Sequence, residues 1–71
     1  MNSEIRKRFQ EFIGKEISAR FDTRSSTWVF HTYEKDNFNA KITDVNDDCV
    51  ILKIGDSTSY IPFRSIGTVW V

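Results

Sequence analysis

This 71-residue sequence has very few of the residues that cross-link small domains. It contains one cysteine, Cys49, and one histidine, His31. A single cysteine excludes a disulfide within the chain and a cysteine-rich metal cage, and a single histidine supplies too few ligands for a metal site. We therefore predict no metal and no cofactor. Because a domain of this size buries only roughly 60% of its unfolded surface, oligomerisation is the stabilising device that remains.

An excess of charge and a long apolar run are also missing. Ten Lys and Arg residues balance ten Asp and Glu residues. This balance removes the simplest argument for nucleic-acid binding, which is a strongly basic domain. No stretch approaches the ~18 apolar residues that a membrane helix needs. The apolar positions near Ile5 are interrupted by Arg6, Lys7 and Arg8, unlike those of a signal peptide, so we predict a soluble, cytoplasmic protein that enters no membrane.

Residue combinations that support catalysis are scarce as well. His31 would have to serve Cys49 or a serine as a base, and no sequence context suggests either pair. The glycines at positions 14, 55 and 67 are scattered rather than gathered into a phosphate-binding loop. The acidic turn at Asp47 and Asp48 is too short for a calcium loop. We therefore predict that the chain is not an enzyme and takes no small-molecule substrate.

The sequence does contain two clear hydrophobic periods, and the first is helical. Ile5, Phe9, Phe12 and Ile13 follow the spacing of one helical face, and charged residues occupy many of the other positions. Gly14 suits the left-handed conformation that often follows a helix. The pattern predicts an amphipathic helix over residues 3–13.

After Gly14 the period becomes two, which is typical of β-strands. The run from Cys49 to Ile54 is nearly all apolar and is expected to be buried on both faces, whereas Pro62 favours an edge or bulge position. The apolar runs and the turns between them predict strands at about 15–22, 27–33, 37–45, 49–54, 58–63 and 66–71. We expect one mainly β domain over residues 1–71. It has an N-terminal α-helix followed by a five- or six-stranded, strongly bent antiparallel sheet or small SH3-like barrel.

The second half of the chain resembles a known family. The segment AKITDVNDDCVILKIGDSTSYIPFRSIGTVWV, from Ala40 to Val71, is similar to the second half of Sm-like proteins of the bacterial Hfq branch. In this segment CVILK follows a short acidic turn, and IPFRSIGTV occupies the place of the family's short second Sm motif. A helix followed by a bent meander of strands is also the family's element order. The resemblance implies an Sm-like small β-barrel that forms a homo-oligomeric ring and binds single-stranded RNA.

Several family positions differ in this chain. Phe63 and Arg64 stand where Hfq proteins have a Lys-His pair that reaches the central pore. Cys49 stands in place of a stacking aromatic residue, and Ala40 in place of a glycine that permits bending. By resemblance, Arg64 and Phe63 are the expected RNA-binding residues of a central cationic site. The alternative for Arg64 is an ion pair with an acid such as Asp44.

Further candidates for RNA contact lie outside this segment. Arg6 and Arg8 belong to a basic cluster of the helix, for which the alternative is a solvated helix face. Trp28, Phe30 and Tyr33 are candidates for a base-stacking platform. Trp28 and Phe30 share one strand face, which favours packing against the barrel or a neighbouring subunit instead.

Two single residues have simple structural interpretations. His31 is interpreted as a surface strand residue rather than a proton carrier. Cys49 opens an apolar strand and is interpreted as a small apolar filler rather than a reactive thiol.

The last two strands are expected to be the exposed edges of the sheet, because monomeric proteins blunt edges with charge and residues 67–71 have no charged side chain. Pairing of one edge with the other edge of the next copy is head-to-tail and repeats until a ring closes. By resemblance we expect a ring of five to seven subunits, with six favoured. The predicted interface residues are Tyr60, Ile61, Thr68, Val69, Trp70 and Val71.

Two functions are therefore predicted as alternatives. The first is an Sm-like ring that binds RNA through a central cationic site. The second is a non-catalytic self-assembling or protein-interaction module that binds no nucleic acid. The neutral charge and the absent pore residues favour the second, whereas the resemblance favours the first.

Overall fold

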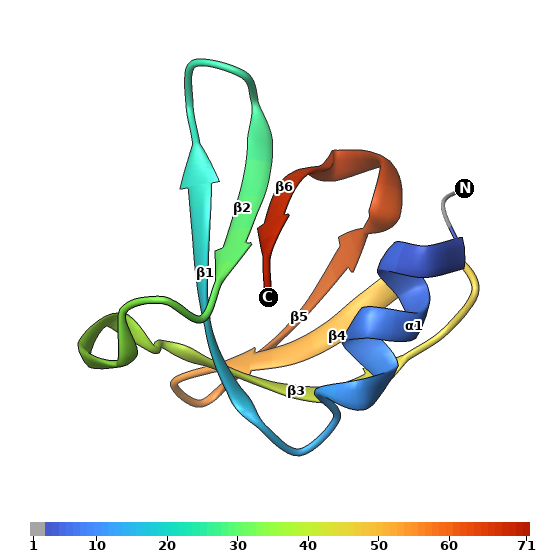
Figure 1. Ribbon diagram of the computed structural model, residues 1–71, viewed down its shortest axis with the longest axis horizontal. Helices are drawn as coiled ribbons and strands as arrows, with labels where there is room; N and C mark the ends of the chain where they lie inside the picture. The colour runs from blue at the N-terminus through green and yellow to red at the C-terminus, as the bar shows by residue number, and fades with distance from the viewer. Residues whose placement is uncertain (1–2) are drawn as a thin grey trace.

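The computed structural model describes residues 3–71, in which one helix precedes a strongly bent six-stranded sheet (Figure 1). The elements are α1 (Ser3–Glu11), β1 (Glu16–Asp22), β2 (Thr27–His31), β3 (Ala40–Val45), β4 (Cys49–Ile54), β5 (Ser57–Pro62) and β6 (Ile66–Trp70). Two short 3-10 helices, η1 (Lys35–Asn37) and η2 (Phe63–Ser65), lie in the β2–β3 and β5–β6 connections. The predicted mainly β fold is confirmed. Within the described residues, no helix is long and apolar enough to cross a membrane.

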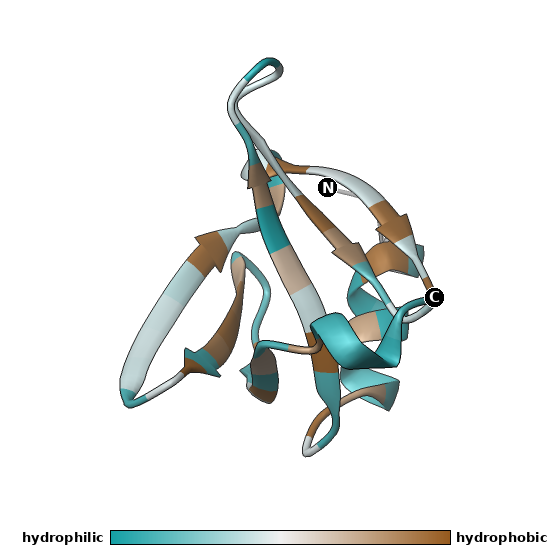
Figure 2. Ribbon diagram, turned by 90° about the vertical axis from the view of Figure 1, so that its left-hand side faces the viewer, coloured by the Kyte–Doolittle hydropathy of each residue, from teal (hydrophilic) through white to brown (hydrophobic). Residues whose placement is uncertain are grey.

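The sheet bends at β1, because β1 is shared between two groups of strands. Glu16 and Ile17 pair with β3, whereas residues 18–22 pair with β2. The strand order is β5-β4-β3-β1-β2-β6, so β5 and β6 are the two end strands, as predicted, and the sheet is not closed into a barrel. The β1–β2 hairpin stands across β3 and β4 and projects beyond them (Figure 1). Its tip, at the top of Figure 2, is hydrophilic.

The last strand departs from the predicted antiparallel arrangement. β6 pairs with β2 in parallel, while the other four strand pairings are antiparallel. β2 runs antiparallel to β1 and lies between β1 and β6, so β6 also runs antiparallel to β1 and the sheet is mixed.

The hydrophobic core lies inside the bend. Phe9 of α1 packs edge to face on Phe30 of β2, with ring centroids 5.0 Å apart and planes at 79°. Both rings are buried, together with the inward residues of the bent sheet, which are Ile17, Ala19, Ala40, Ile42, Val45, Val50, Leu52 and Ile61. Burial of this apolar surface is the main stabilising contribution to the fold.

The helix ends two residues earlier than predicted. Gly14 adopts the expected left-handed conformation with φ of 87°, and its N–H donates to the carbonyl oxygen of Ile42 at 2.7 Å. This bond turns the chain from α1 into the sheet after a short turn at residues 12–14. Phe12 still packs against the core, but Ile13 is exposed, so the prediction of Ile13 on the buried face is wrong.

The start of β3 differs from the prediction, because the side chain of Asn39 hydrogen-bonds to the backbone of β1 just before the strand begins. β3 begins at Ala40 rather than at residue 37, and Asn39 extends the ladder with its side chain. The N–H of Ala19 donates to Oδ1 of Asn39 at 2.8 Å, and Nδ2 of Asn39 donates to the carbonyl oxygen of Ala19 at 2.9 Å. Asn39 therefore joins β1 to the β2–β3 connection.

The apolar strand β4 is not buried on both faces, contrary to expectation. Val50 and Leu52 are buried and Ile54 packs against the core on the same side, whereas Cys49 and Ile51 on the other side are half-buried. The strand is covered by the core on one side only, and the other side forms part of the outer surface of the bent sheet.

Candidate functional site

The expected central cationic site has one exposed cation at its position. Arg64 lies in η2 with an exposed side chain and forms no ion pair within residues 3–71, so the alternative pairing with Asp44 is wrong. The carboxylate of Asp44 instead accepts a hydrogen bond from the N–H of Val45 at 2.8 Å. Phe63 is half-buried and its ring centroid lies 6.2 Å from that of Phe9, which places Phe63 against the core rather than in solvent.

The helix cations are partly committed to other contacts. Arg6 Nη1 lies 3.3 Å from Asp47 Oδ1, a pair that links α1 to the β3–β4 turn. Arg8 Nη1 lies 3.9 Å from Glu11 Oε2 one turn along the helix. Both pairs are accessible to solvent and contribute little stability. They nevertheless reduce the cationic charge that α1 presents to a ligand.

A second surface gathers residues that the sequence did not place together. We call it the outer face: the side of β1, β2 and β6 that is turned away from the core. Residues paired across strands point to the same side, so the register fixes its members. They are Ser18, Arg20 and Asp22 of β1, Thr27, Val29 and His31 of β2, and Thr68 and Trp70 of β6.

Two exposed aromatic side chains lie at one end of the outer face. The rings of Tyr33 and Trp70 have centroids 6.5 Å apart and planes only 24° from parallel. Tyr33 is 60% exposed and Trp70 is 59% exposed. The two residues are held close together by the backbone, because the N–H of Thr32, next to Tyr33, donates to the carbonyl oxygen of Trp70 at 3.0 Å. This pair, the Tyr33–Trp70 pair, is an accessible stacking surface.

His31 lies beneath the Tyr33–Trp70 pair and is only 2% exposed. The interpretation of His31 as a surface residue is therefore wrong. Its ring meets the Tyr33 ring at 87°, with centroids 4.0 Å apart. Its Nδ1 is buried and makes no hydrogen bond within the described residues. Tyr33, which follows β2 in the chain, covers a position that alternation alone would leave in solvent.

The other predicted stacking residues face the core. Phe30 is fully buried, and Trp28 is half-buried with its ring 6.5 Å from that of Phe30. The interpretation of Trp28 and Phe30 as packing residues is confirmed. Of the three aromatic candidates, only Tyr33 is available to a ligand on the outer face.

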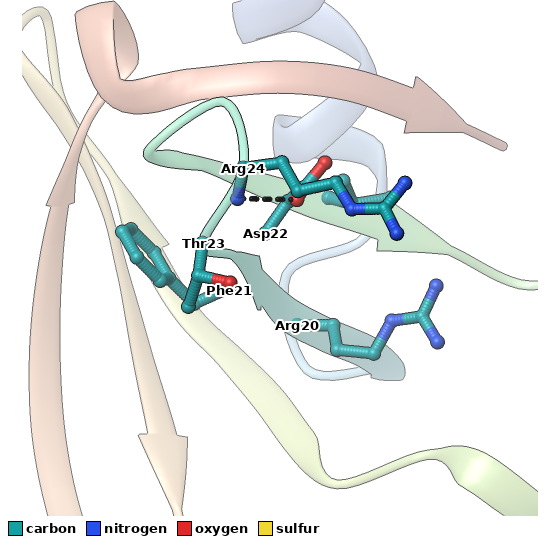
Figure 3. Close-up of a pocket in the computed structure, with 6 residues that line it drawn as sticks. Arg20, Phe21, Asp22, Thr23 and Arg24 are labelled. Carbon is teal, nitrogen blue, oxygen red and sulfur yellow. Dashed lines mark hydrogen bonds between the residues drawn. The ribbon is translucent and has the colours of Figure 1, made fainter.

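The other end of the outer face carries two arginines. Arg20 comes from β1 and Arg24 from the β1–β2 turn, and both side chains extend to the same side of the hairpin (Figure 3). Both arginines line a depression of about 400 Å³. Its lining residues are Arg20, Phe21, Asp22, Thr23, Arg24 and Val29.

The end strands have backbone edges without charged side chains. Neither β5 nor β6 contains an Asp, Glu, Lys or Arg. Of the predicted interface residues, Tyr60, Thr68, Trp70 and Val71 are exposed, and Val69 is half-buried. Ile61 has its side chain in the core, so only its backbone could take part in a contact with a second chain.

Within residues 3–71, no three His, Cys, Asp or Glu side chains come together as a potential metal-ligand group. Cys49 is a half-buried free thiol. Comparison of the chain with protein-family models, with curated proteins and with solved structures gives no match.

Proposed function

We propose that this chain is a non-catalytic protein that binds single-stranded RNA on its outer face. The observation that carries the proposal is the Tyr33–Trp70 pair, whose nearly parallel rings are both more than half exposed. Large exposed aromatic side chains on a sheet surface are a usual stacking platform for unpaired bases. The similarity of residues 40–71 to Sm-like proteins supports the same ligand class. The free thiol of Cys49 suits a reducing compartment, and we include a cytoplasmic location in the proposal.

Base stacking predicts a measurable contribution to the RNA-binding free energy. Each stacked base contributes about 1–3 kcal/mol, as judged by alanine substitution of the aromatic partner, and the contribution tolerates any base. A neutral chain can therefore bind RNA through stacking with only a small number of phosphate contacts. Little sequence preference is expected.

The test is fluorescence anisotropy with a labelled uridine oligomer of about 12 nucleotides, which covers a small β-domain. We expect Trp70→Ala and Tyr33→Ala each to weaken binding by roughly 5- to 150-fold, which corresponds to the loss of about 1–3 kcal/mol. Tyr60→Ala is the matched control, because Tyr60 is an exposed aromatic residue of β5 and lies outside the outer face. Absence of binding by the wild-type chain, or equal losses in all three variants, would refute the proposal.

Arg64 distinguishes the outer face from the predicted central cationic site. In a symmetric ring each subunit would contribute one Arg64, and the sum would be a ring of positive charge even though the chain is neutral. We expect Arg64→Ala to weaken RNA binding less than Trp70→Ala does. The opposite ranking would move the RNA site from the outer face to the central position.

A second candidate function is self-assembly without RNA, and one observation favours it. The two end strands, β5 and β6, contain no charged side chain, whereas the rest of the chain contains twenty. An uncharged edge presents backbone donors and acceptors to another strand. Pairing β5 of one copy with β6 of the next is head-to-tail and would generate the ring of about six subunits that the Sm-like resemblance implies.

Light scattering at micromolar concentration tests assembly with or without RNA. We expect a mass of about six times 8.3 kDa. Thr58→Lys on β5 and Thr68→Lys on β6 place a charge on each exposed edge and should dissociate the ring. Gln10→Lys on the exposed side of α1 adds the same charge away from the edges and should leave the mass unchanged. A wild-type mass of 8.3 kDa would refute the assembly proposal.

Backbone geometry identifies a further interface variant. The carbonyl oxygen of Trp70 faces β2, where it accepts from Thr32 N–H, and backbone groups of successive strand residues alternate between the two edges. The N–H of Val69 therefore faces the open edge. Val69→Pro removes this donor and should also dissociate the ring.

A further inference from the structure

We propose that Arg20 and Arg24 form a phosphate-binding site for the backbone of the RNA strand that stacks on the Tyr33–Trp70 pair. The inference rests on the proposed RNA binding and names the part of the outer face that holds the phosphates. It also gives the path of the bound RNA over the protein surface, which follows β2 from the Tyr33–Trp70 pair to the hairpin tip.

Arg20 and Arg24 line one depression from different parts of the chain. Arg20 lies opposite Val29 in the β1–β2 ladder, and Arg24 reaches over from the turn. The depression has a volume of about 400 Å³, and both arginine side chains extend to the same side of the hairpin (Figure 3). Val29 is the aliphatic residue among those that line the depression. Planar guanidinium groups bind phosphate oxygens in forked geometry, which makes arginine well suited to this ligand.

A hydrogen bond within the β1–β2 turn uses the backbone of Arg24 and does not involve its guanidinium group. The backbone N–H of Arg24 donates to Oδ1 of Asp22 at 3.0 Å, so the carboxylate holds the main chain of the turn. Neither Arg20 nor Arg24 forms an ion pair within residues 3–71, in contrast to Arg6 and Arg8 of α1. Both side chains are exposed. The hairpin therefore presents two cationic groups whose charges are not offset by a salt bridge.

The spacing along β2 connects this site to the aromatic pair. Val29 and His31 are two residues apart on the same side of β2, and a strand rises about 3.3 Å per residue. The row that contains Arg20 is thus about 7 Å from the row that contains His31 and Trp70. Arg24 lies farther toward the tip. A single strand can stack bases at one end of the outer face and place successive phosphates against the arginines.

The salt dependence of RNA affinity tests this assignment separately from base stacking. Log affinity falls with log salt concentration by ~0.7 per phosphate contact for a single strand. We expect the double variant Arg20→Gln/Arg24→Gln to weaken binding and to reduce the slope by about 1.4. Trp70→Ala should weaken binding with an unchanged slope, because stacking releases no counterions.

Lys41→Gln/Lys53→Gln is the matched control. These two exposed lysines face each other across β3 and β4, and their loss changes the net charge by the same amount. A wild-type slope in the arginine double variant, or an equal decrease in the lysine double variant, would overturn the inference while RNA binding itself stands. Failure of the wild-type chain to bind RNA would overturn both proposals.

Competition with inorganic phosphate at constant ionic strength distinguishes a nucleic-acid backbone from a free phosphate group. We expect RNA to remain bound at low millimolar phosphate, because a backbone site gains from neighbouring contacts. Displacement of RNA from the wild-type chain, but not from the arginine double variant, would reassign the depression to a free phosphate ligand and overturn the inference.

Discussion

The two parts of the bent sheet differ in what their side chains do. The packing half, which consists of α1, β3, β4 and β5, supplies most of the fully buried residues. The hairpin half, which consists of residues 18–22 of β1 with β2 and β6, supplies only Ala19 and Phe30 to the apolar core. It carries the exposed Tyr33–Trp70 pair at one end, Arg20 on β1 and Arg24 at its tip. Stability and candidate ligand contacts are thus largely separated, and substitutions in the two halves should have different consequences.

One edge-to-face ring contact joins the two halves and another lies within the hairpin half, which makes the comparison direct. Phe9 meets Phe30 at 79° with centroids 5.0 Å apart, and Phe21 meets Trp28 at 68° with centroids 5.5 Å apart. Phe9 is 1% exposed, whereas Phe21 is 46% exposed. The two contacts differ mainly in burial, so burial rather than edge-to-face geometry should determine their contributions to stability.

The largest effect is expected at Phe9. Phe9→Ala should lower the free energy of unfolding by about 3–5 kcal/mol, because it removes a buried aromatic ring and leaves a cavity beside Phe30. Urea denaturation followed by tryptophan fluorescence measures the change. Lys7→Ala on the exposed side of the same helix is the control and should change stability by less than about 0.5 kcal/mol. Equal effects of the two variants would show that α1 does not close the core.

The next effect tests how β6 is attached to the hairpin half. A Cβ at Gly67 would contact Oγ1 of Thr27 and lie 2.8 Å from its Cβ, and the β2–β6 register shifts at this position. Gly67→Ala should therefore destabilise the chain by about 1–3 kcal/mol through overpacking. Thr68→Ala, at the neighbouring exposed position, should be nearly neutral. An unchanged urea midpoint for Gly67→Ala would contradict the close approach of β6 to Thr27.

A smaller effect is expected at the junction between the two halves. Asn39→Ala removes both hydrogen bonds to the backbone of Ala19 and leaves a partly buried N–H and carbonyl without partners. The expected loss is about 1–2 kcal/mol. Asn37→Ala is the control, because Asn37 is exposed and its side chain hydrogen-bonds to the exposed Glu34. Amide hydrogen exchange at Ala19 should accelerate in the Asn39 variant alone.

Local sequence patterns predicted much of the packing half. The helical spacing placed Phe9 in the core, the position of Gly14 predicted its left-handed conformation, and Pro62 was correctly assigned to an edge strand. Each of these features depends on neighbouring residues in the chain. The same kind of evidence places Arg20 on the solvent side of β1.

The outer face could not be predicted in this way, because its residues meet through distant pairings. Trp70 lies beside His31 only because β6 runs parallel to β2, and no local pattern gives the direction of that pairing. His31 alternates toward solvent, yet Tyr33 covers it from the following connection. Arg6 pairs with Asp47, 41 residues away, for the same reason. The period-two pattern indicates which side chains share a strand face but not which strands adjoin.

The smallest predicted effect completes the comparison of the two ring pairs. Phe21→Ala removes an edge-to-face contact with Trp28 that resembles the one between Phe9 and Phe30, but the Phe21 ring is nearly half exposed before the substitution. Little apolar surface returns to water and no enclosed cavity forms, so the expected loss is about 0.5–1.5 kcal/mol, the usual value of an aromatic pair. Urea denaturation of Phe21→Ala beside Phe9→Ala gives the measurement. A loss of unfolding free energy in Phe21→Ala as large as that in Phe9→Ala would mean that a second chain buries the hairpin in solution. In that case the two variants should show equal losses only at protein concentrations at which the chain assembles.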